Sequence, residues 1–187
     1  MSSYTFKIEV IPMVVTIIRH TRVGVPRGVC YGWSDVPLAE SFEQEAALTK
    51  SRLEGMVFDH VFTSPLTRAR RLADYCGYAE ATVDDRLKEC HMGEWEMQRY
   101  DDIQDPVLQQ WYEDYMHVQP TGGESFPDLY RRVSAFLDEL KQKKYHHVAL
   151  FAHGGVALCG GIYAGLFTEK ETADHLLGYG EMMEIEI

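Results

Sequence analysis

Five side chains in this sequence could act together on an anionic ester, and each lies near the end of a segment with the composition of a strand: Arg19, His20, Arg68, Glu89 and His153. A neutral imidazole becomes a nucleophile when one ring nitrogen donates a hydrogen bond and leaves the other free to attack. Guanidinium groups stay charged, and their planar donors match phosphate oxygens. Each residue alone has an ordinary explanation, such as a surface ion pair, a solvated carboxylate or a hydrogen-bonded core histidine. The combination predicts phosphoryl chemistry.

These residues suit the separate tasks of phosphoryl transfer. We expect His20 to be the nucleophile. Arg19 and Arg68 would hold the equatorial oxygens, over which the charge of the transition state spreads. His153 can donate to the remaining oxygen, and Gly154 after it lets the backbone come close. The pattern therefore predicts a phosphate site that contains its own nucleophile.

The leaving oxygen still needs a proton, and Glu89 can supply it. A positioned general acid contributes typically about 10²–10⁴-fold to a rate. A competing hypothesis makes His20, His153 and a carboxylate the ligands of a zinc ion, which is chemically reasonable. The sequence has neither a helical His-Glu-x-x-His pattern nor an aspartate cluster to support it. We therefore expect no metal ion, and activity that survives a strong chelator would exclude one.

Short strands must position these side chains. Val14 to Ile18 is a nearly continuous apolar, β-branched run, typical of a strand covered on both faces. Phe58 to Thr63, Thr82-Val83 and Val148 to Ala152 are expected to be further strands. The carboxyl ends of parallel strands meet at one edge of a sheet, where ligands bind in open α/β folds. The four strand ends would therefore bring the five residues together.

Helical patterns alternate with these strands. They predict an α/β fold, a three-layer sandwich with a mostly parallel, doubly wound sheet and helices on both faces. Ser64 and Pro65 are expected to be the N-cap and first residue of a helix that carries Arg68 in its first turn. Thr168 and Glu171 have the spacing of a capping box. The expected helices cover residues 38–54, 65–75, 124–140, 154–166 and 169–177, and a final strand covers 182–187.

Two segments are harder to place within the single domain expected for residues 1–187. Residues 1–12 alternate apolar and polar side chains before Pro12, as an extra edge strand or a loosely ordered extension would. Residues 93–119 are expected to form a helical insertion over the active site. Their aromatic side chains would either stack on a flat substrate or fill a core, and we favour a core for most of them.

Composition limits the possible partners. The chain has 187 residues, 45% of them hydrophobic, and a net charge of -11, which disfavours nucleic acid and anionic membranes as partners. No apolar run approaches the roughly 20 residues that span a bilayer. The four cysteines are scattered without metal-ligand spacing, as in reduced proteins. We expect a cytoplasmic protein that acts on a small phosphorylated substrate without a cofactor. Its oligomeric state is open, with a homodimer as one possibility.

Five motifs together resemble the histidine phosphatase superfamily, the phosphoglycerate-mutase-like proteins. They extend in order over most of the chain: Arg19-His20-Thr21, Ser64-Pro65-Leu66 with Arg68-Ala69, Arg86-Leu87-Lys88-Glu89 with Gly93-Glu94-Trp95-Glu96, Gly122-Gly123-Glu124-Ser125, and His153-Gly154-Gly155. The resemblance implies a phosphohistidine on His20, a phosphate pocket from Arg19, Arg68 and His153, and Glu89 as proton donor. It also implies that no metal or organic cofactor is needed.

The loop after His20 is similar to that of α-ribazole phosphatases, which remove the 5′-phosphate of α-ribazole 5′-phosphate in cobalamin biosynthesis. Thr21 stands where glycine is commoner, and Cys30-Tyr31-Gly32 follows in the loop. We expect these four residues to line the substrate site, with the Gly32 N–H near the phosphate. A plain turn is the alternative reading of the segment.

The sequence departs from the wider family at two places. Met97 stands where glycine usually follows Glu96, and Ala152 precedes His153 where threonine or serine is frequent. Neither change touches the five chemical residues, so they leave the substrate in doubt rather than the reaction.

Two other functions use the same fold. A phosphoglycerate mutase would have the same five residues but would return the phosphate to a bound acid. The short chain and the Cys-Tyr-Gly segment favour a phosphatase, and release of inorganic phosphate without isomerised product would distinguish them. A non-catalytic binding module would have lost part of the chemical set, whereas this chain retains all of it.

Overall fold

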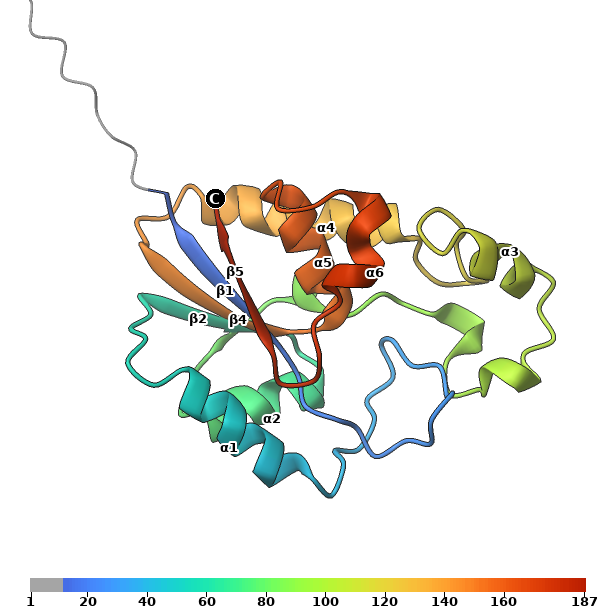
Figure 1. The fold of residues 1–187 in the computed structure, drawn as a ribbon, viewed down its shortest axis with the longest axis horizontal. Coiled ribbons are helices and arrows are strands. Elements are labelled where there is room, and N and C mark those ends of the chain that lie inside the picture. The colour runs from blue at the N-terminus through green and yellow to red at the C-terminus, as the bar shows by residue number, and fades with distance from the viewer. Residues whose placement is uncertain (1–11) are drawn as a thin grey trace, which may run out of the picture.

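The computed structural model describes residues 12–187 and shows a central sheet between two layers of helices (Figure 1). The expected edge strand in residues 1–12 lies, apart from its last residue, outside the described part. The sheet order is β3-β2-β4-β1-β5. The five strands of the described part are β1 Val14–Arg19, β2 His60–Thr63, β3 Thr82–Val83, β4 His147–Ala152 and β5 Met182–Glu186.

The strand register aligns the ends that carry the predicted chemistry. β1 runs parallel to β4, with Arg19 opposite Ala152, and β2 runs parallel to β4, with Thr63 opposite Phe151. His20, Ser64 and His153 therefore leave the sheet side by side. β5 pairs with β1 in the antiparallel direction, so the predicted mostly parallel sheet is confirmed with one reversed edge strand.

Helices cover both faces of the sheet, as predicted. α1 and α2 lie on one side, and α4, α5 and α6 lie on the other (Figure 1). The α-helices are α1 Phe42–Arg52, α2 Thr67–Tyr75, α3 Val107–Glu113, α4 Phe126–Leu140, α5 Gly154–Tyr163 and α6 Thr172–His175.

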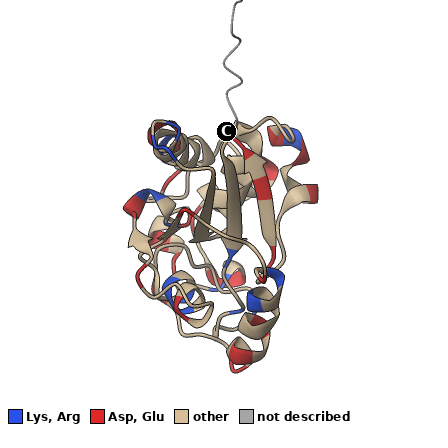
Figure 2. Ribbon diagram, turned by 90° about the vertical axis from the view of Figure 1, so that its left-hand side faces the viewer, with Lys and Arg blue, Asp and Glu red and all other residues tan. Residues whose placement is uncertain are grey.

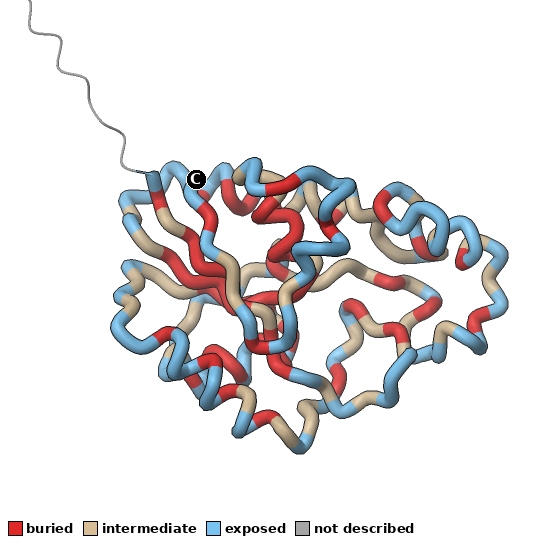
Figure 3. The backbone as a smooth tube through the Cα atoms, viewed as in Figure 1, coloured by how far each residue is buried: buried red, intermediate tan, exposed pale blue. Residues whose placement is uncertain are grey.

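Alternation along β4 divides the core into two apolar clusters. Val148 and Leu150 pack with α4 and α5, while Ala149 and Phe151 pack with α1 and α2. These four residues are fully buried, and Figure 3 shows long buried stretches in the inner strands. Each large side chain so buried contributes about 1.5–3 kcal/mol relative to exposure. This burial on both faces explains the near-continuous apolar runs in the sequence.

Lys, Arg, Asp and Glu residues lie mainly on the helices and loops, as the colours of the ribbon in Figure 2 show. Among the ten inner positions Val14 to Ile18 and Val148 to Ala152 there is no Lys, Arg, Asp or Glu. Arg19 at the end of β1 is the exception on the inner strands, which already marks that end of the sheet as the polar one. No helix in residues 12–187 is long and apolar enough to cross a membrane.

Two predicted helix starts were wrong because loop contacts compete with helical turns. Residues before Phe42 stay in a loop, where Leu38 forms an isolated bridge with Val23. α2 begins at Thr67 rather than at Pro65, because the Asp35 carboxylate accepts from the Thr67 N–H at 2.9 Å and caps the helix from another loop. Arg68 remains in the first turn, as predicted.

The other helical predictions differ from the structure by small amounts. α4 begins after Ser125, whose capping box with Asp128 leaves the side chain of Glu124 outside the helix. The Thr168 and Glu171 capping box is present, but it starts a 3-10 turn that continues into the short α6.

The segment 93–119 is helical only in part. It contains α3 and two 3-10 turns, Gly93–Trp95 and Tyr100–Asp102, with loop between them. Trp95, Ile103 and Leu108 form a small cluster of their own, and the Trp111 ring packs edge-on against Trp95 with centroids 5.7 Å apart. Aromatic packing in place of regular helix holds part of this segment together. The core role expected for most of its aromatic residues fits Tyr100 and Trp111, which pack partly buried against the cluster, and is wrong for Tyr112 and Tyr115, which are exposed.

Candidate active site

His20 is held as a neutral nucleophile at the end of β1. It is 2% exposed, and its Nδ1 lies 2.7 Å from the carbonyl oxygen of Thr21. Because a carbonyl only accepts, Nδ1 carries the proton and Nε2 keeps its lone pair. Burial, followed by the charge of Arg68, lowers the pKa of His20 to about 3. The imidazole is therefore uncharged at neutral pH, and the nitrogen that can attack is known.

His153 lies beside His20, with ring centroids 5.2 Å apart. It is fully buried, and its Nε2 lies 2.8 Å from the Ser64 hydroxyl. Burial, followed by the charge of Arg68, lowers the pKa of His153 well below its ordinary value. His153 is thus a neutral hydrogen-bonding group rather than a cation.

Arg68 is fully buried in the first turn of α2. Its two terminal nitrogens donate to loop carbonyls, at 3.0 Å to Ser34 and 2.6 Å to Gly32. Arg19 enters from β1 and donates to the Leu177 carbonyl. Both guanidinium groups are therefore oriented by uncharged backbone oxygens.

Buried polar atoms without partners gather around His20. Within residues 12–187, five buried side-chain nitrogen or oxygen atoms have no hydrogen-bond partner, and four belong to this site: Arg19 Nε, Thr21 Oγ1, Arg68 Nε and His153 Nδ1. Unpaired buried polar groups are rare in proteins because each costs about 1–3 kcal/mol. Three of the four are nitrogens, so the site is suited to a ligand that offers several acceptor oxygens.

Glu89 completes the set from the loop after β3. Its carboxylate accepts from the Cys90 N–H at 2.9 Å and from the Gly155 N–H at 3.2 Å, at the start of α5. A Cβ on residue 155 would lie 2.3 Å from Glu89 Oε1, so glycine is required for this approach. Arg132 donates to the Glu89 carbonyl at 2.8 Å and fixes the backbone. The carboxyl group is thereby held at the α5 end of the site.

Four of the five residues expected to bind the substrate lie next to the chemical residues. Thr21 orients His20 through its carbonyl, and Tyr31 places its ring 5.3 Å from the Arg68 guanidinium. Gly32 presents its carbonyl to Arg68, and a Cβ there would lie 2.0 Å from the Cys90 carbonyl; an approach of its N–H to the phosphate stays a prediction. A Cβ on Gly154 would lie 3.4 Å from Arg19. These four residues therefore adjoin the chemical set.

Cys30 does not line the substrate site, contrary to the prediction. Its side chain is 1% exposed and packs with Met92 and Trp95 in the cluster of segment 93–119. Burial raises the pKa of its thiol to about 11. Because successive residues of an extended loop point in opposite directions, Tyr31 faces the site while its neighbour fills the core.

Comparison with known proteins agrees with this geometry. The family model of the histidine phosphatase superfamily (branch 1) matches residues 15–175. The chain belongs to the histidine phosphatase superfamily. It is 29% identical over 149 residues to the adenosylcobalamin/α-ribazole phosphatase of Escherichia coli K12, covering 75% of this chain and 73% of that protein. It is 32% identical over 135 residues to a protein named probable phosphoglycerate mutase from Photorhabdus laumondii, covering 68% and 62% of the two chains.

Solved structures of the superfamily have the same architecture. The α-ribazole phosphatase of Shigella flexneri superposes with a TM-score of 0.83 at 26% identity, over 94% of this chain and 91% of that chain. The phosphoglycerate-mutase-like fold predicted from the sequence is confirmed. The family and the relatives named as phosphatases show that this histidine phosphatase is a phosphoric monoester hydrolase.

Sequence reasoning missed three side chains of this phosphatase site. Tyr179 places its ring 4.2 Å from the Arg19 guanidinium, Ser64 bonds His153, and Arg132 holds the Glu89 segment. The Ser64-Pro65 pattern predicts only a helix cap for Ser64, and nothing in the sequence around Arg132 marks it as a contact of Glu89. Tyr179 stands between two glycines. This pattern predicts a loop, but it does not predict which residues the tyrosine contacts.

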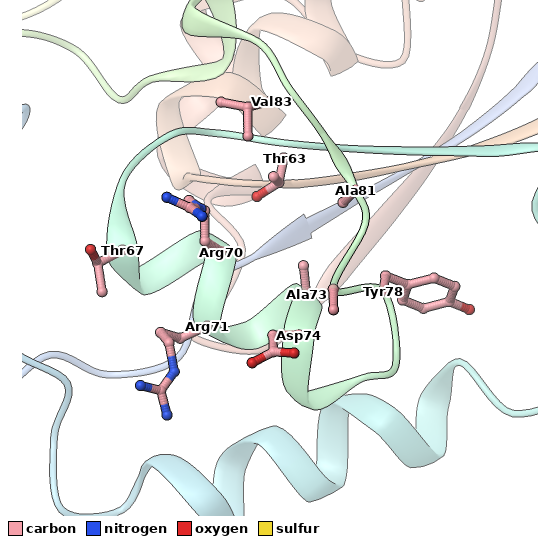
Figure 4. A pocket seen from close by; sticks show the side chains of 10 residues that line it. Thr63, Thr67, Arg70, Arg71, Ala73, Asp74, Tyr78, Ala81 and Val83 are labelled. Atoms are coloured by element: carbon pink, nitrogen blue, oxygen red, sulfur yellow. The ribbon is translucent and has the colours of Figure 1, made fainter.

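Two hollows lie near the phosphatase site. A pocket of about 490 Å³ is lined by the loop after His20 together with Tyr100 and Tyr179. Another, of about 420 Å³, is lined by α2 and by residues between Tyr78 and Val83, and Figure 4 shows Arg70 of α2 beside Thr63. None of the five chemical residues lines this second pocket.

The described part of the chain contains no group of three or more His, Cys, Asp or Glu side chains placed to hold a metal ion. His20 Nδ1 is bonded to a carbonyl, and the Glu89 oxygens accept from two backbone N–H groups. His20 Nε2 and His153 Nδ1 remain free, but no third side chain joins them in a metal-binding group within the described residues.

Proposed function

We propose that the protein hydrolyses a small phosphomonoester in two steps through a phosphohistidine on His20. In the first step the Nε2 lone pair forms a bond to phosphorus, the ester P–O bond breaks, and protonated Glu89 gives its proton to the leaving oxygen. In the second step water attacks phosphorus, the N–P bond breaks, and Glu89 takes a proton from the water. Inorganic phosphate and the free alcohol are the products.

The observation that carries this proposal is the group of unpaired buried donors around a neutral, oriented imidazole. Arg19 Nε, Arg68 Nε and His153 Nδ1 can all donate to phosphoryl oxygens. Donors placed in advance in a buried site stabilise the charge that develops on those oxygens without reorganisation, and this is usually the largest contribution to catalysis. His20 needs no proton removed before attack, because burial keeps it neutral.

The proposed substrate is α-ribazole 5′-phosphate, in the assembly of the cobalamin nucleotide loop. Thr21 and the Cys30-Tyr31-Gly32 segment support it, and so do the printed names of the relatives from Escherichia coli and Shigella flexneri. The four cysteines are free thiols, in keeping with the expected cytoplasmic location. No nucleic acid or membrane partner is part of the proposal, and a homodimer remains a prediction.

A second function, phosphotransfer of the phosphoglycerate mutase type, is favoured by one observation. Relatives at 32% identity carry that name. The two functions differ in the fate of the phosphoryl group, which goes to water in one and back to a bound acid in the other.

A phosphate-release screen tests the choice. It compares kcat/KM for α-ribazole 5′-phosphate, 3-phosphoglycerate, sugar phosphates, nucleotides and a phosphotyrosyl peptide. The same screen is run with His20→Ala, and with His146→Ala as a control, because His146 is an exposed histidine on the opposite end of the sheet. We expect α-ribazole 5′-phosphate to have the highest kcat/KM. Release that persists in His20→Ala would overturn the mechanism, and isomerised phosphoglycerate without phosphate would favour the mutase.

A further inference from the structure

The pocket of about 490 Å³ shares a wall with the phosphate site. Tyr31 and Tyr179 line the pocket, and the same two rings contact the phosphate-binding cations, at 5.3 Å from Arg68 and 4.2 Å from Arg19. Tyr179 also lies next to the nucleophile, with its ring centroid 5.7 Å from that of His20. The Tyr179 side chain therefore adjoins both the pocket and the nucleophilic His20.

The shared wall is built from two distant parts of the chain. The Tyr31 and Tyr179 hydroxyls are 3.0 Å apart, although the residues are 148 positions apart in sequence. Their bond joins the loop after His20 to the loop before β5. Behind this pair, His20, Arg68 and His153 are at most 2% exposed. A phosphate held among these residues lies next to the two tyrosines, so the alcohol portion of the substrate has an aromatic wall beside it.

The lining of the pocket indicates what kind of alcohol fits there. Three tyrosines, Tyr31, Tyr100 and Tyr179, provide aromatic faces, and Val23, Val25 and Val29 provide aliphatic surface. The ten lining residues include two arginines and no carboxylate. Aromatic faces bind flat rings by stacking, and guanidinium groups can stack on such rings as well. The volume is within the range of small-molecule sites.

We infer that this pocket is the subsite for the leaving alcohol, that it selects a flat aromatic or heteroaromatic ring, and that Tyr31 and Tyr179 determine this specificity. The inference rests on the proposed function, since it needs the phosphate at His20. It adds residues and a preference that the phosphate chemistry alone does not require. A compact acid such as 3-phosphoglycerate leaves the aromatic faces unused.

The test uses two esters with the same reacting group. α-Ribazole 5′-phosphate and ribose 5-phosphate share the primary 5′-ester and differ by the ring, so the ratio of their kcat/KM values reports ring binding. We expect a ratio of about tenfold or more in the parent protein, which corresponds to the binding of one stacked base. Tyr179→Ala should remove most of this ratio, whatever it does to the rate on both esters through Arg19.

Two further variants keep the test decisive. Val25→Trp adds bulk to the pocket lining while both tyrosines are retained, and it should also lower the ratio, so a misfolded Tyr179→Ala would not end the experiment. Tyr75→Ala is the matched control, because Tyr75 is exposed to almost the same extent, 37% against 36% for Tyr179, and also has a cation near its ring, but lies at the end of α2. It should leave the ratio unchanged.

The outcomes distinguish failure of the alcohol subsite from failure of the proposed function. A ratio near one in the parent, or a full ratio in both Tyr179→Ala and Val25→Trp, would overturn the subsite while His20-dependent phosphate release still supported the proposed function. Absence of His20-dependent release from every ester would instead refute the proposed function itself.

Discussion

The neutral state of His20 predicts a specific loss of stability in acid. The folded protein holds this imidazole with its pKa lowered to about 3, against 6.5 in an unfolded chain. Below pH 6.5 the unfolded state therefore binds a proton that the folded state refuses, and the free energy of unfolding falls as the pH falls. The loss continues until the pH reaches the folded pKa. The slope for one such group is about 1.4 kcal/mol per pH unit.

The magnitude is large enough to measure. Between pH 6.5 and 4.5, His20 alone should cost about 2 kcal/mol, a large part of the usual 5–15 kcal/mol of a folded domain. His153 is buried beside it, and its lowered pKa acts in the same direction. His20 is 2% exposed, so solvent screens its interactions with neighbouring charges only a little.

The assay is urea denaturation at half-unit pH steps from 7.5 to 4.5, in a buffer without phosphate. His20→Asn removes the titrating group, and its side-chain amide can still donate to the Thr21 carbonyl. We expect the variant to lose stability with falling pH less steeply than the parent, by about 1.4 kcal/mol per pH unit between pH 6 and 4.5. His146→Asn is the control, since the His146 side chain is 77% exposed, and its pH dependence should follow the parent. Parallel curves for His20→Asn and the parent would refute the claim that the folded protein keeps His20 neutral.

Three further predictions concern the proton donor and the loop that follows it. Glu89→Gln should lower kcat by about 10²–10⁴-fold on alkyl phosphates and much less on aryl phosphates, whose leaving groups need little protonation; equal losses on both would exclude the assigned role. Gly155→Ala should also reduce kcat by at least about 10²-fold, because its Cβ would lie 2.3 Å from Glu89 Oε1 and displace the carboxyl group, and an active variant with unchanged kcat would contradict this. Met97→Gly should raise the free energy of unfolding by about 0.5–1 kcal/mol in urea denaturation, because a left-handed backbone strains any residue with a Cβ. Met97 has φ 63° and a side chain that is 52% exposed, so little packing is lost, and a destabilised variant would show that the side chain makes contacts that outweigh the strain.

Local sequence patterns predicted most of the fold because the inner strands are buried on both faces. A run such as Val14 to Ile18 is favourable in few places other than an inner strand of a covered sheet, and its length matches β1 closely. Helix starts were less accurate, because a helix end depends on which groups satisfy its first N–H donors. At α2 that group is Asp35, from a loop 32 residues earlier, and no pattern around Ser64 contains this information.

The same distinction applies to the active site. Arg19, His20, Arg68, Glu89 and His153 were each recognisable as chemical residues near strand ends, and parallel pairing was sufficient to predict that they meet. The side chains that tune them were not recognisable. Ser64 bonds His153 and Tyr179 contacts Arg19 only because β2, β4 and β1 are neighbours and β5 returns beside them.

By itself the sequence determined the chemistry of this protein: a β-branched strand that ends in Arg19-His20, and the partners that make a phosphoryl group its natural target. Residue types and the periodicity of apolar positions are local properties of the chain, so they can be recognised from the sequence alone. Only the tertiary structure decided that Nε2 of His20 is the free nitrogen, that Cys30 packs in a core, and that Tyr31 meets Tyr179 beside a pocket. These facts depend on burial and on contacts between segments far apart in sequence, and both arise only when the chain closes on itself.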